Sequence, residues 1–305
     1  MARILPTLLV LALLGCTAAA FAVTEGLKLE KSPIGGTKVG KTLAPVCGCD
    51  RDQLPIAFFL RKRDRVTVAI VNGNGEVVRT LSTRNARRGT QQFIWNGRGS
   101  SGRLVADGIY RPRVHLAREH RTIVLPNSIR VDQTAPLIRL DSVSPRVFSP
   151  DGDFRREFVR LHYRTSEKAR AVLYLNGDRR TLTKRYVRAG KLDWGGRAAR
   201  KLAAGTYRVQ LRAIDLAGNL SKPTRAFVVR VRYIEVRPHV LQAKSGARIG
   251  FRIVTDAQRY SWHFGSVHRI GHGSPLVFRA GPPGLYVLRV AANGHVARAV
   301  VTVTP

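Results

Sequence analysis

Hydrophobic and polar residues alternate with a period of two along most of the chain beyond residue 22. In the run that starts at Tyr110, the apolar side chains of Val114 and Leu116 alternate with Arg113 and His115. The same alternation is found over residues 158–164 and after Tyr207. A period of two with one apolar face is typical of half-buried antiparallel strands. No segment after residue 22 keeps the i, i+3, i+4 apolar spacing of a helix, so the pattern predicts an all-β fold.

One motif occurs three times in front of these alternating runs. It consists of a Trp, a nearby Gly, a loop, and a Gly-x-Tyr that opens the next strand. The copies are Trp95, Gly97, Gly108 and Tyr110; Trp194, Gly196, Gly205 and Tyr207; and Trp262, Gly265, Gly284 and Tyr286. We predict that each Trp fills a core and that each Tyr points its ring inward and its hydroxyl to the rim. The Gly of Gly-x-Tyr would allow a backbone conformation that a β-carbon opposes.

These repeats are spaced like domains, well beyond the roughly 20–50 residues of solenoid repeats. They predict tandem β-sandwiches over residues 54–132, 133–233 and 234–305. Asn72 to Gly75 marks a hairpin between strands 66–71 and 76–81. Pro136 supports the first boundary because proline blocks continuation of a strand. Residues 23–53 are predicted to be an extended linker or a first strand.

Four segments of the first domain resemble the Ig-like domain of the flagellar hook-capping protein FlgD. They are residues 66–71 (VTVAIV), 75–81 (GEVVRTL), 93–97 (FIWNG) and 107–110 (DGIY). The resemblance covers residues 54–132 well and 135–232 more weakly. It implies Ig-like sandwiches, a domain type also found in secreted bacterial proteins, and implies little about function. Residues 260–265 (YSWHFG) are similar to the core of polycystic-kidney-disease-type Ig-like domains, with His263 where that family has Asp.

Residues 1–22 read as a secretory signal peptide. A basic Arg3 precedes the apolar stretch 4–14, and Ala20-Phe21-Ala22 fits the small-x-small cleavage rule. Two alternatives stay open. Leu13 to Cys16 resembles a bacterial lipobox with Cys16 as the lipidated residue, and the stretch is near the length of an uncleaved signal anchor. We expect a secreted or envelope-associated protein with no transmembrane helix in the mature chain.

Charge is the main compositional signal. The chain has 53 Lys and Arg against 19 Asp and Glu, a net charge of +34. Such a charge draws a protein to polyanions, although solvated strand faces would carry the same residues. Because a secreted chain does not meet intracellular nucleic acid, the expected partner is an anionic polymer of the cell envelope or an envelope protein. Binding of that polymer should weaken with salt.

The sequence offers few residues for chemistry. Cys47 and Cys49 leave three possibilities: a local disulfide, an intermolecular link or two thiols. Their closeness argues against a bridge within one chain, since disulfides join separated, facing β-carbons.

Asp151 and Asp153 alternate like the first ligands of a calcium loop, but no third carboxylate follows at a suitable place, so an Asx turn is expected. His263, His268 and His272 have spacings that suit no standard zinc site. We therefore predict no metal and no cofactor.

No group of residues fills the roles of nucleophile, base and oxyanion donor, and no P-loop or Gly-x-Ser-x-Gly elbow is present. The sequence thus predicts a non-enzymatic, secreted Ig-like repeat protein that acts as an envelope scaffold or adhesion module. The alternatives are a flagellar hook-assembly scaffold of the FlgD type and an accessory carbohydrate-binding array.

Overall fold

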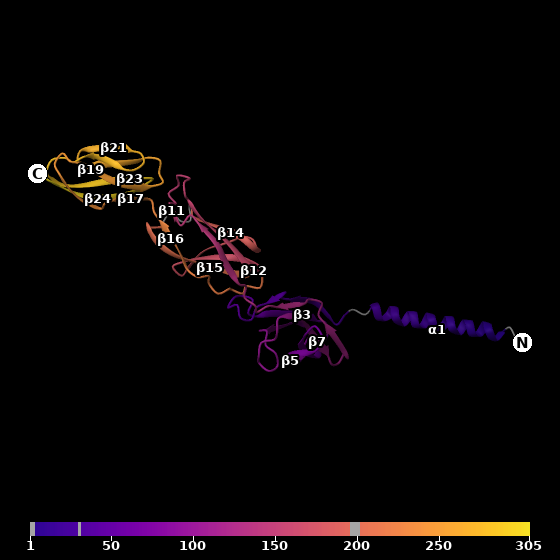
Figure 1. Cartoon of the computed structure of the whole chain (residues 1–305). Coiled ribbons are helices and arrows are strands. Elements are labelled where there is room, and N and C mark those ends of the chain that lie inside the picture. The colour runs from indigo at the N-terminus through magenta and orange to yellow at the C-terminus, as the bar shows by residue number, and fades with distance from the viewer. Residues whose placement is uncertain (1–3, 30–31, 196–201) are drawn as a thin grey trace. The chain divides into compact units, whose positions relative to one another are not determined.

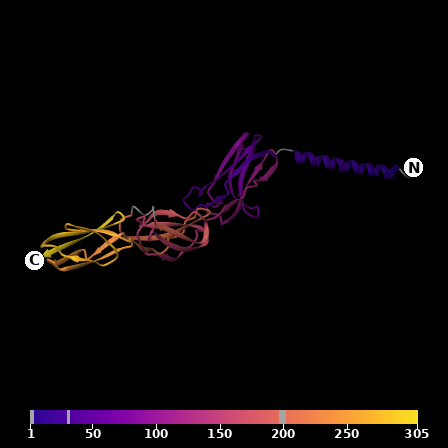
Figure 2. The same ribbon diagram turned by 90° about the horizontal axis from the view of Figure 1, so that it is seen from above.

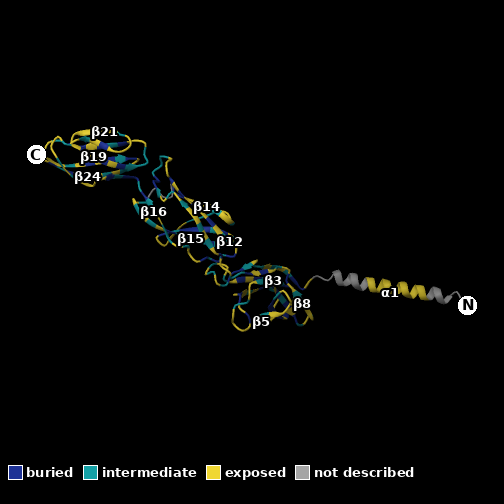
Figure 3. Cartoon of the chain, in the orientation of Figure 1, coloured by how far each residue is buried: buried dark blue, intermediate teal, exposed yellow. Residues whose placement is uncertain are grey.

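A computed structural model of the chain describes residues 4–29, 32–195 and 202–305, and it confirms the all-β prediction (Figure 1). Helix α1 (Ile4–Leu29) precedes the strands and runs beyond the predicted end of the signal peptide. Its side chains at positions 9–21 are all exposed (Figure 3). Within the described residues, no helix combines the length and apolarity that crossing a membrane requires.

The chain divides into two compact units, residues 1–133 and 134–305. The first unit contains α1 and one β-sandwich, whose hydrophobic core runs from Ile34 to Val131. Its smaller sheet has the order β1 (Ile34–Val39), β3 (Leu54–Leu60), β6 (Gly89–Trp95). Its larger sheet has the order β2 (Thr42–Leu43), β9 (Ile129–Val131), β7 (Gly108–Leu116), β4 (Asp64–Val71), β5 (Val77–Ala86), with β8 (Arg121–Val124) paired to β7. Of the two alternatives for residues 23–53, the first strand is therefore correct for residues 34–39, because β1 pairs with β3.

The second unit holds two further hydrophobic cores, and its strands form two groups in both views (Figures 1 and 2). The second sandwich is built on β12 (Phe158–Leu175), whose first half pairs with β10 (Ile138–Ser144) and β14 (Val187–Gly195). The second half of β12 pairs with β13 (Asp178–Leu182) and β15 (Gly205–Asp215). Strands β16 (Phe227–Val231) and β11 (Val147–Phe148) complete the sheet.

The third sandwich follows directly. One sheet has the order β17 (Ile234–Arg237), β19 (Arg248–Thr255), β22 (Leu276–Arg279). The other has the order β18 (Val240–Lys244), β24 (His295–Thr304), β23 (Gly284–Ala292), β20 (Tyr260–Phe264), β21 (Val267–Gly271). Buried residues from both sheets form its core, and Figure 3 colours them dark blue along the strands.

The Trp of each repeated motif lies in a core. The exposed fractions are 1% for Trp95, 4% for Trp194 and 7% for Trp262. Each Trp packs on an aromatic partner. The ring centroids are 5.4 Å apart for Trp95 and Tyr110, 5.2 Å for Trp194 and Phe148, and 5.0 Å for Trp262 and Phe278. Burial of large aromatic rings is a leading contribution to core stability.

The Tyr of each motif makes the same hydrogen bond. Each hydroxyl donates to the backbone carbonyl four residues earlier, at 2.9 Å for Tyr110, 2.8 Å for Tyr207 and 3.0 Å for Tyr286. This bond closes the loop before each strand, as a tyrosine corner does in Ig-like sandwiches.

The glycines of the motif differ from one another. Gly205 and Gly284 have φ of 156°, which favours glycine. Gly108 is not among the residues with positive φ, and a β-carbon there would lie 3.7 Å from the Tyr110 ring, an ordinary contact. The expected need for glycine therefore does not hold at Gly108. Gly196 lies outside the described residues.

Candidate functional site

Cys47 and Cys49 form a disulfide, with their Cα atoms 5.2 Å apart. They lie in a tight turn between β2 and β3, where the Cys47 amide donates to the Ala44 carbonyl at 3.1 Å. Gly48 between them has φ of 60°, a conformation that costs glycine little. The turn brings the two Cα atoms within the usual range for disulfides of about 4.4–6.8 Å. The argument that the cysteines are too close to bridge was therefore wrong. Cys16 is an exposed, free cysteine on α1.

The three candidate histidines do not converge. His263 on β20 lies opposite His268 on β21, with ring centroids 6.4 Å apart, and both are exposed. His272 follows β21, and its Nδ1 lies 3.3 Å from the Gln258 carbonyl oxygen. The His272 side chain lines a cavity of about 720 Å³ together with Asp153 and Asn293, away from His263 and His268.

Strand register places His263 and His268 in a line of basic residues across the third sandwich. His268 on β21, His263 on β20, Arg289 on β23 and Arg298 on β24 are consecutive cross-strand partners. All four side chains are exposed. We call these four residues the basic row.

No acid neutralises the basic row from its own sandwich. Residues 234–305 contain two acids, Glu235 and Asp256. Glu235 pairs with Arg230 and, at 3.2 Å, with Arg237. Asp256 faces two other carboxylates, as shown below. Like charges directly opposite one another in a sheet are destabilising, so the pairing of Arg289 with Arg298 costs the third sandwich stability.

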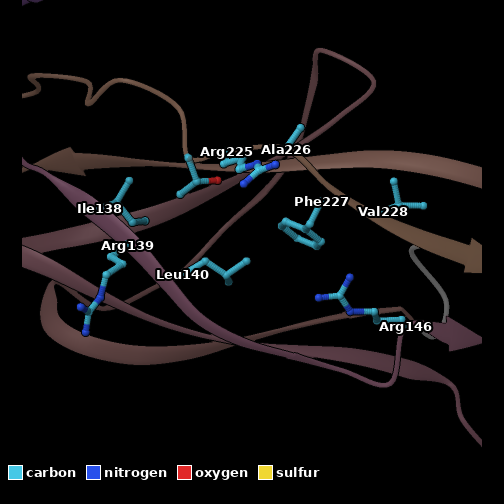
Figure 4. A pocket seen from close by; sticks show the side chains of 9 residues that line it. Ile138, Arg139, Leu140, Arg146, Arg225, Ala226, Phe227 and Val228 are labelled. Carbon is cyan, nitrogen blue, oxygen red and sulfur yellow. The ribbon is translucent and has the colours of Figure 1, made fainter.

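A second basic feature is a cavity of about 580 Å³ between β10 and β16 in the second sandwich. Figure 4 shows Arg139, Arg146 and Arg225 arranged around the apolar side chains of Leu140 and Phe227. Arg139 donates to Asp141 at 3.2 Å, and Asp141 also pairs with Arg164 at 3.0 Å. Among the described residues, no carboxylate pairs with Arg146 or Arg225. The cavity thus suits a ligand with an anionic group and an apolar part.

Three carboxylates meet in the second unit, where the sequence predicted no third one. One carboxylate oxygen each from Asp151, Asp153 and Asp256 lies within 4.8 Å of the others. Asp151 and Asp153 belong to the loop between β11 and β12, and Asp256 directly follows β19 in the third sandwich. No third carboxylate follows Asp153 within its own loop, and the third member of the group comes from a segment distant in the sequence.

Two neighbouring side chains hydrogen-bond this group, which we call the aspartate cluster (Asp151, Asp153 and Asp256). The Asn293 amide nitrogen donates to Asp151 at 3.1 Å and to Asp153 at 3.0 Å. The Ser149 hydroxyl donates to Asp151 at 3.2 Å. The expected Asx turn is also present, since the Arg155 backbone amide donates to Asp153 Oδ1 at 2.8 Å.

Burial raises the pKa of the Asp256 carboxyl above its usual 3.8, and the charges of Asp153 and Asp151 raise it further. The Ser149 hydroxyl and the backbone amide of Asp256 oppose this rise. Ionisation of Asp256 is therefore disfavoured, because desolvation and neighbouring like charges both destabilise an ionised carboxylate.

Sequence patterns gave no signal for Asp256 or Asn293 as members of a site. Both follow strands, in turns where Asp and Asn are common. The contact of Asp256 with a loop of another sandwich cannot be predicted from the spacing of neighbouring residues. The Arg residues of the basic row were visible as outward strand positions, but their alignment depends on strand register.

Comparison with known proteins supports the resemblance seen in the first domain. Residues 59–119 match the family model of the FlgD Ig-like domain. The structure of FlgD from P. aeruginosa is similar with 20% identity, covering 37% of this chain and 83% of that one, at a TM-score of 0.25. The sequence matches no curated protein.

Other similar structures are also multidomain β-proteins. The fibronectin(III)-like modules of Clostridium thermocellum CbhA share 16% identity over 64% of this chain and 93% of that one, with a TM-score of 0.35. The I67–I69 fragment of titin shares 12% identity over 90% of this chain and 99% of that one, with a TM-score of 0.30. These similarities concern the fold.

Proposed function

We propose that this chain is a secreted, non-enzymatic protein of Ig-like domains that serves as a scaffold or adhesion module at the cell envelope. It binds an anionic envelope polymer through exposed Arg-rich strand faces. The observation that carries this proposal is the basic row, in which four basic side chains line up with no acid from their own sandwich.

The geometry of the basic row suits a linear polyanion. Neighbouring strands lie about 4.8 Å apart, so the row spans roughly 14 Å. Arg289 and Arg298 can each bind phosphate or carboxylate oxygens in a bidentate manner. Binding of this kind gains free energy mainly from release of counterions, which makes it strongly dependent on salt.

The rest of the molecule supports the same partner chemistry. The net charge of +34 leaves most cations without an acid to pair with, and the arginine-lined cavity of the second sandwich adds a second anion-accepting surface. A signal peptide would bring these surfaces to envelope polymers and away from intracellular nucleic acid.

The test is co-sedimentation of the full chain with isolated bacterial envelopes at roughly 50 and 200 mM salt, where phosphate contacts lose much of their affinity. The double variant Arg289→Ser/Arg298→Ser removes two contacts. We expect weaker binding and a log–log salt slope less steep by roughly 1–2, since each lost contact to a polyanion lowers the slope by somewhat less than one. The matched control is Arg65→Ser/Arg130→Ser, two exposed arginines of the first sandwich with the same change in charge.

Absence of binding at low salt would contradict the proposal. Equal losses in the two double variants would show that net charge and not the basic row is responsible. Binding of a neutral polysaccharide that tolerates salt would favour the carbohydrate-binding alternative.

A further inference from the structure

Three oxygens of the aspartate cluster are buried without a hydrogen-bond partner. Both carboxylate oxygens of Asp256 and Oδ1 of Asp151 each expose less than 1 Å², and within the described part of the chain none has a donor in hydrogen-bonding geometry. The Ser149 hydroxyl is near enough to Asp256 to lower its pKa but donates its hydrogen bond to Asp151. Buried polar atoms are nearly always paired, and burying an ionised carboxylate without a partner is particularly costly. These orphaned oxygens point to a cationic ligand.

No protein cation fills this role. Among the described residues, no Lys or Arg side-chain nitrogen lies within 4.0 Å of the three carboxylates. This is unexpected in a chain with 53 Lys and Arg but only 19 acids. Elsewhere arginines hold acids closely, as Arg160 holds Asp193 at 2.8 Å. The aspartates of the cluster instead face one another.

We propose that Asp151, Asp153 and Asp256 bind a calcium ion that joins the second and third sandwiches. The donors are oxygens, which hard cations prefer. Calcium–oxygen distances of about 2.3–2.6 Å allow ligand oxygens up to roughly 5 Å apart across the ion. The three oxygens lie within 4.8 Å of one another, which is inside this span. Magnesium demands near-ideal octahedral geometry and keeps several of its waters, so a mixed set of side-chain oxygens suits calcium better.

Neighbouring groups can complete the coordination. Calcium takes about 6–8 oxygens, and water and bidentate carboxylates supply part of them. A half-turn of the Asn293 amide exchanges its nitrogen for its oxygen and presents a further ligand to the ion. The Ser149 hydroxyl lies beside Asp151 at 3.2 Å. The adjoining cavity, lined by Asp153 and Asn293, gives solvent access.

Calcium would fix the junction between two sandwiches. Asp151 and Asp153 come from the second sandwich, whereas Asp256 and Asn293 come from the third. The Tyr233 and His295 rings stack at the same junction with centroids 3.5 Å apart, and the Thr255 hydroxyl donates to the Tyr233 carbonyl at 2.9 Å. A cation bound by both sandwiches strengthens this contact and limits their relative motion.

The test compares thermal unfolding of the full chain after chelation and after calcium addition, with calcium binding measured by titration calorimetry. At calcium 100 times its dissociation constant, we expect the Tm of the second unit to rise by roughly 5–10 °C. Magnesium at the same concentration should give a smaller shift. An unchanged Tm together with no binding heat would overturn the proposal.

The decisive variant is Asp256→Asn, which keeps the size of the side chain and removes its charge. We expect it to lose the calcium response while melting in chelator at or above the parent's Tm, because like-charge repulsion is relieved. The control Asp178→Asn removes an exposed acid of the same unit and should keep the response. A calcium shift that survives in Asp256→Asn would refute the assignment of Asp256 as a ligand.

Discussion

At the scale of single residues, the Trp and Tyr of each motif have distinct tasks. The Trp ring fills the core, and the Trp95 indole nitrogen also donates to the Arg98 carbonyl at 3.0 Å in the loop that follows. The Tyr110 hydroxyl closes the end of that loop by donating to the Ala106 carbonyl, four residues before the tyrosine. One motif therefore ties core packing to loop geometry in each sandwich.

Replacing Trp95 with Ala should destabilise the first unit by about 3–5 kcal/mol, the usual cost of truncating a large core aromatic. Urea unfolding followed by circular dichroism measures this loss. The control is Ile94→Ala, since the neighbouring Ile94 is 64% exposed and its truncation should cost far less. If both variants unfolded at the parent's midpoint, Trp95 would not support the core.

At the scale of elements, strand register decides which charges meet. On the outer face of the second sandwich, Arg160 on β12 lies opposite Asp193 on β14, and its two nitrogens donate at 2.8 and 2.9 Å. The hydrogen bond from Arg160 holds the pKa of Asp193 below its usual range. In the third sandwich, Arg289 instead lies opposite Arg298. An arginine is thus stabilised by an aspartate in the second sandwich and repelled by another arginine in the third.

Arg289→Thr should therefore stabilise the third sandwich by about 0.2–1 kcal/mol, because it removes a like-charge pair and places a β-branched residue in a strand. The matched substitution Arg160→Thr removes an attractive pair and should lower stability. Thermal unfolding of both variants in low salt measures whether each substitution raises or lowers the Tm. If Arg289→Thr destabilised the protein as Arg160→Thr does, the basic row would not strain the sheet.

At the scale of the whole molecule, the second unit depends on solution conditions through the aspartate cluster. Asp256 has a raised pKa in the folded state and its ordinary value, near 3.8, when unfolded. A raised pKa gives stability that is complete below the unfolded pKa and is lost as pH rises through the folded pKa. Calcium binds the ionised carboxylates, so with calcium present the stability of the second unit rises with pH.

In chelator, we expect the parent's stability relative to Asp256→Asn to increase as pH falls from 7 toward 3.8. With saturating calcium, the difference should instead favour the parent at pH 7. Thermal unfolding of both proteins across this pH range provides the measurement. Asp256 faces the carboxylates of Asp151 and Asp153, and the adjoining cavity is lined by Arg155, Arg259 and His272. His272→Gln is therefore the control for titration of the histidine ring. A difference that is independent of pH in chelator would contradict a raised pKa.

The sequence alone determined the all-β fold and the Trp and Tyr motif. Both follow from short-range patterns, since a period of two sets which side of a strand is apolar. The hairpin between β4 and β5 was equally local, because Asn72 to Gly75 specifies a tight connection. The resemblance of the first domain to the FlgD Ig-like domain rested on such segments.

Only the tertiary structure decided the features on which the proposals rest. The basic row exists because pairing of β21, β20, β23 and β24 aligns side chains from distant segments. The aspartate cluster exists because Asp256 reaches a loop of another sandwich. The Cys47–Cys49 bond depends on a backbone turn at Gly48. Register, packing between sandwiches and turn conformation bring these groups together, and local spacing carries little information about any of them.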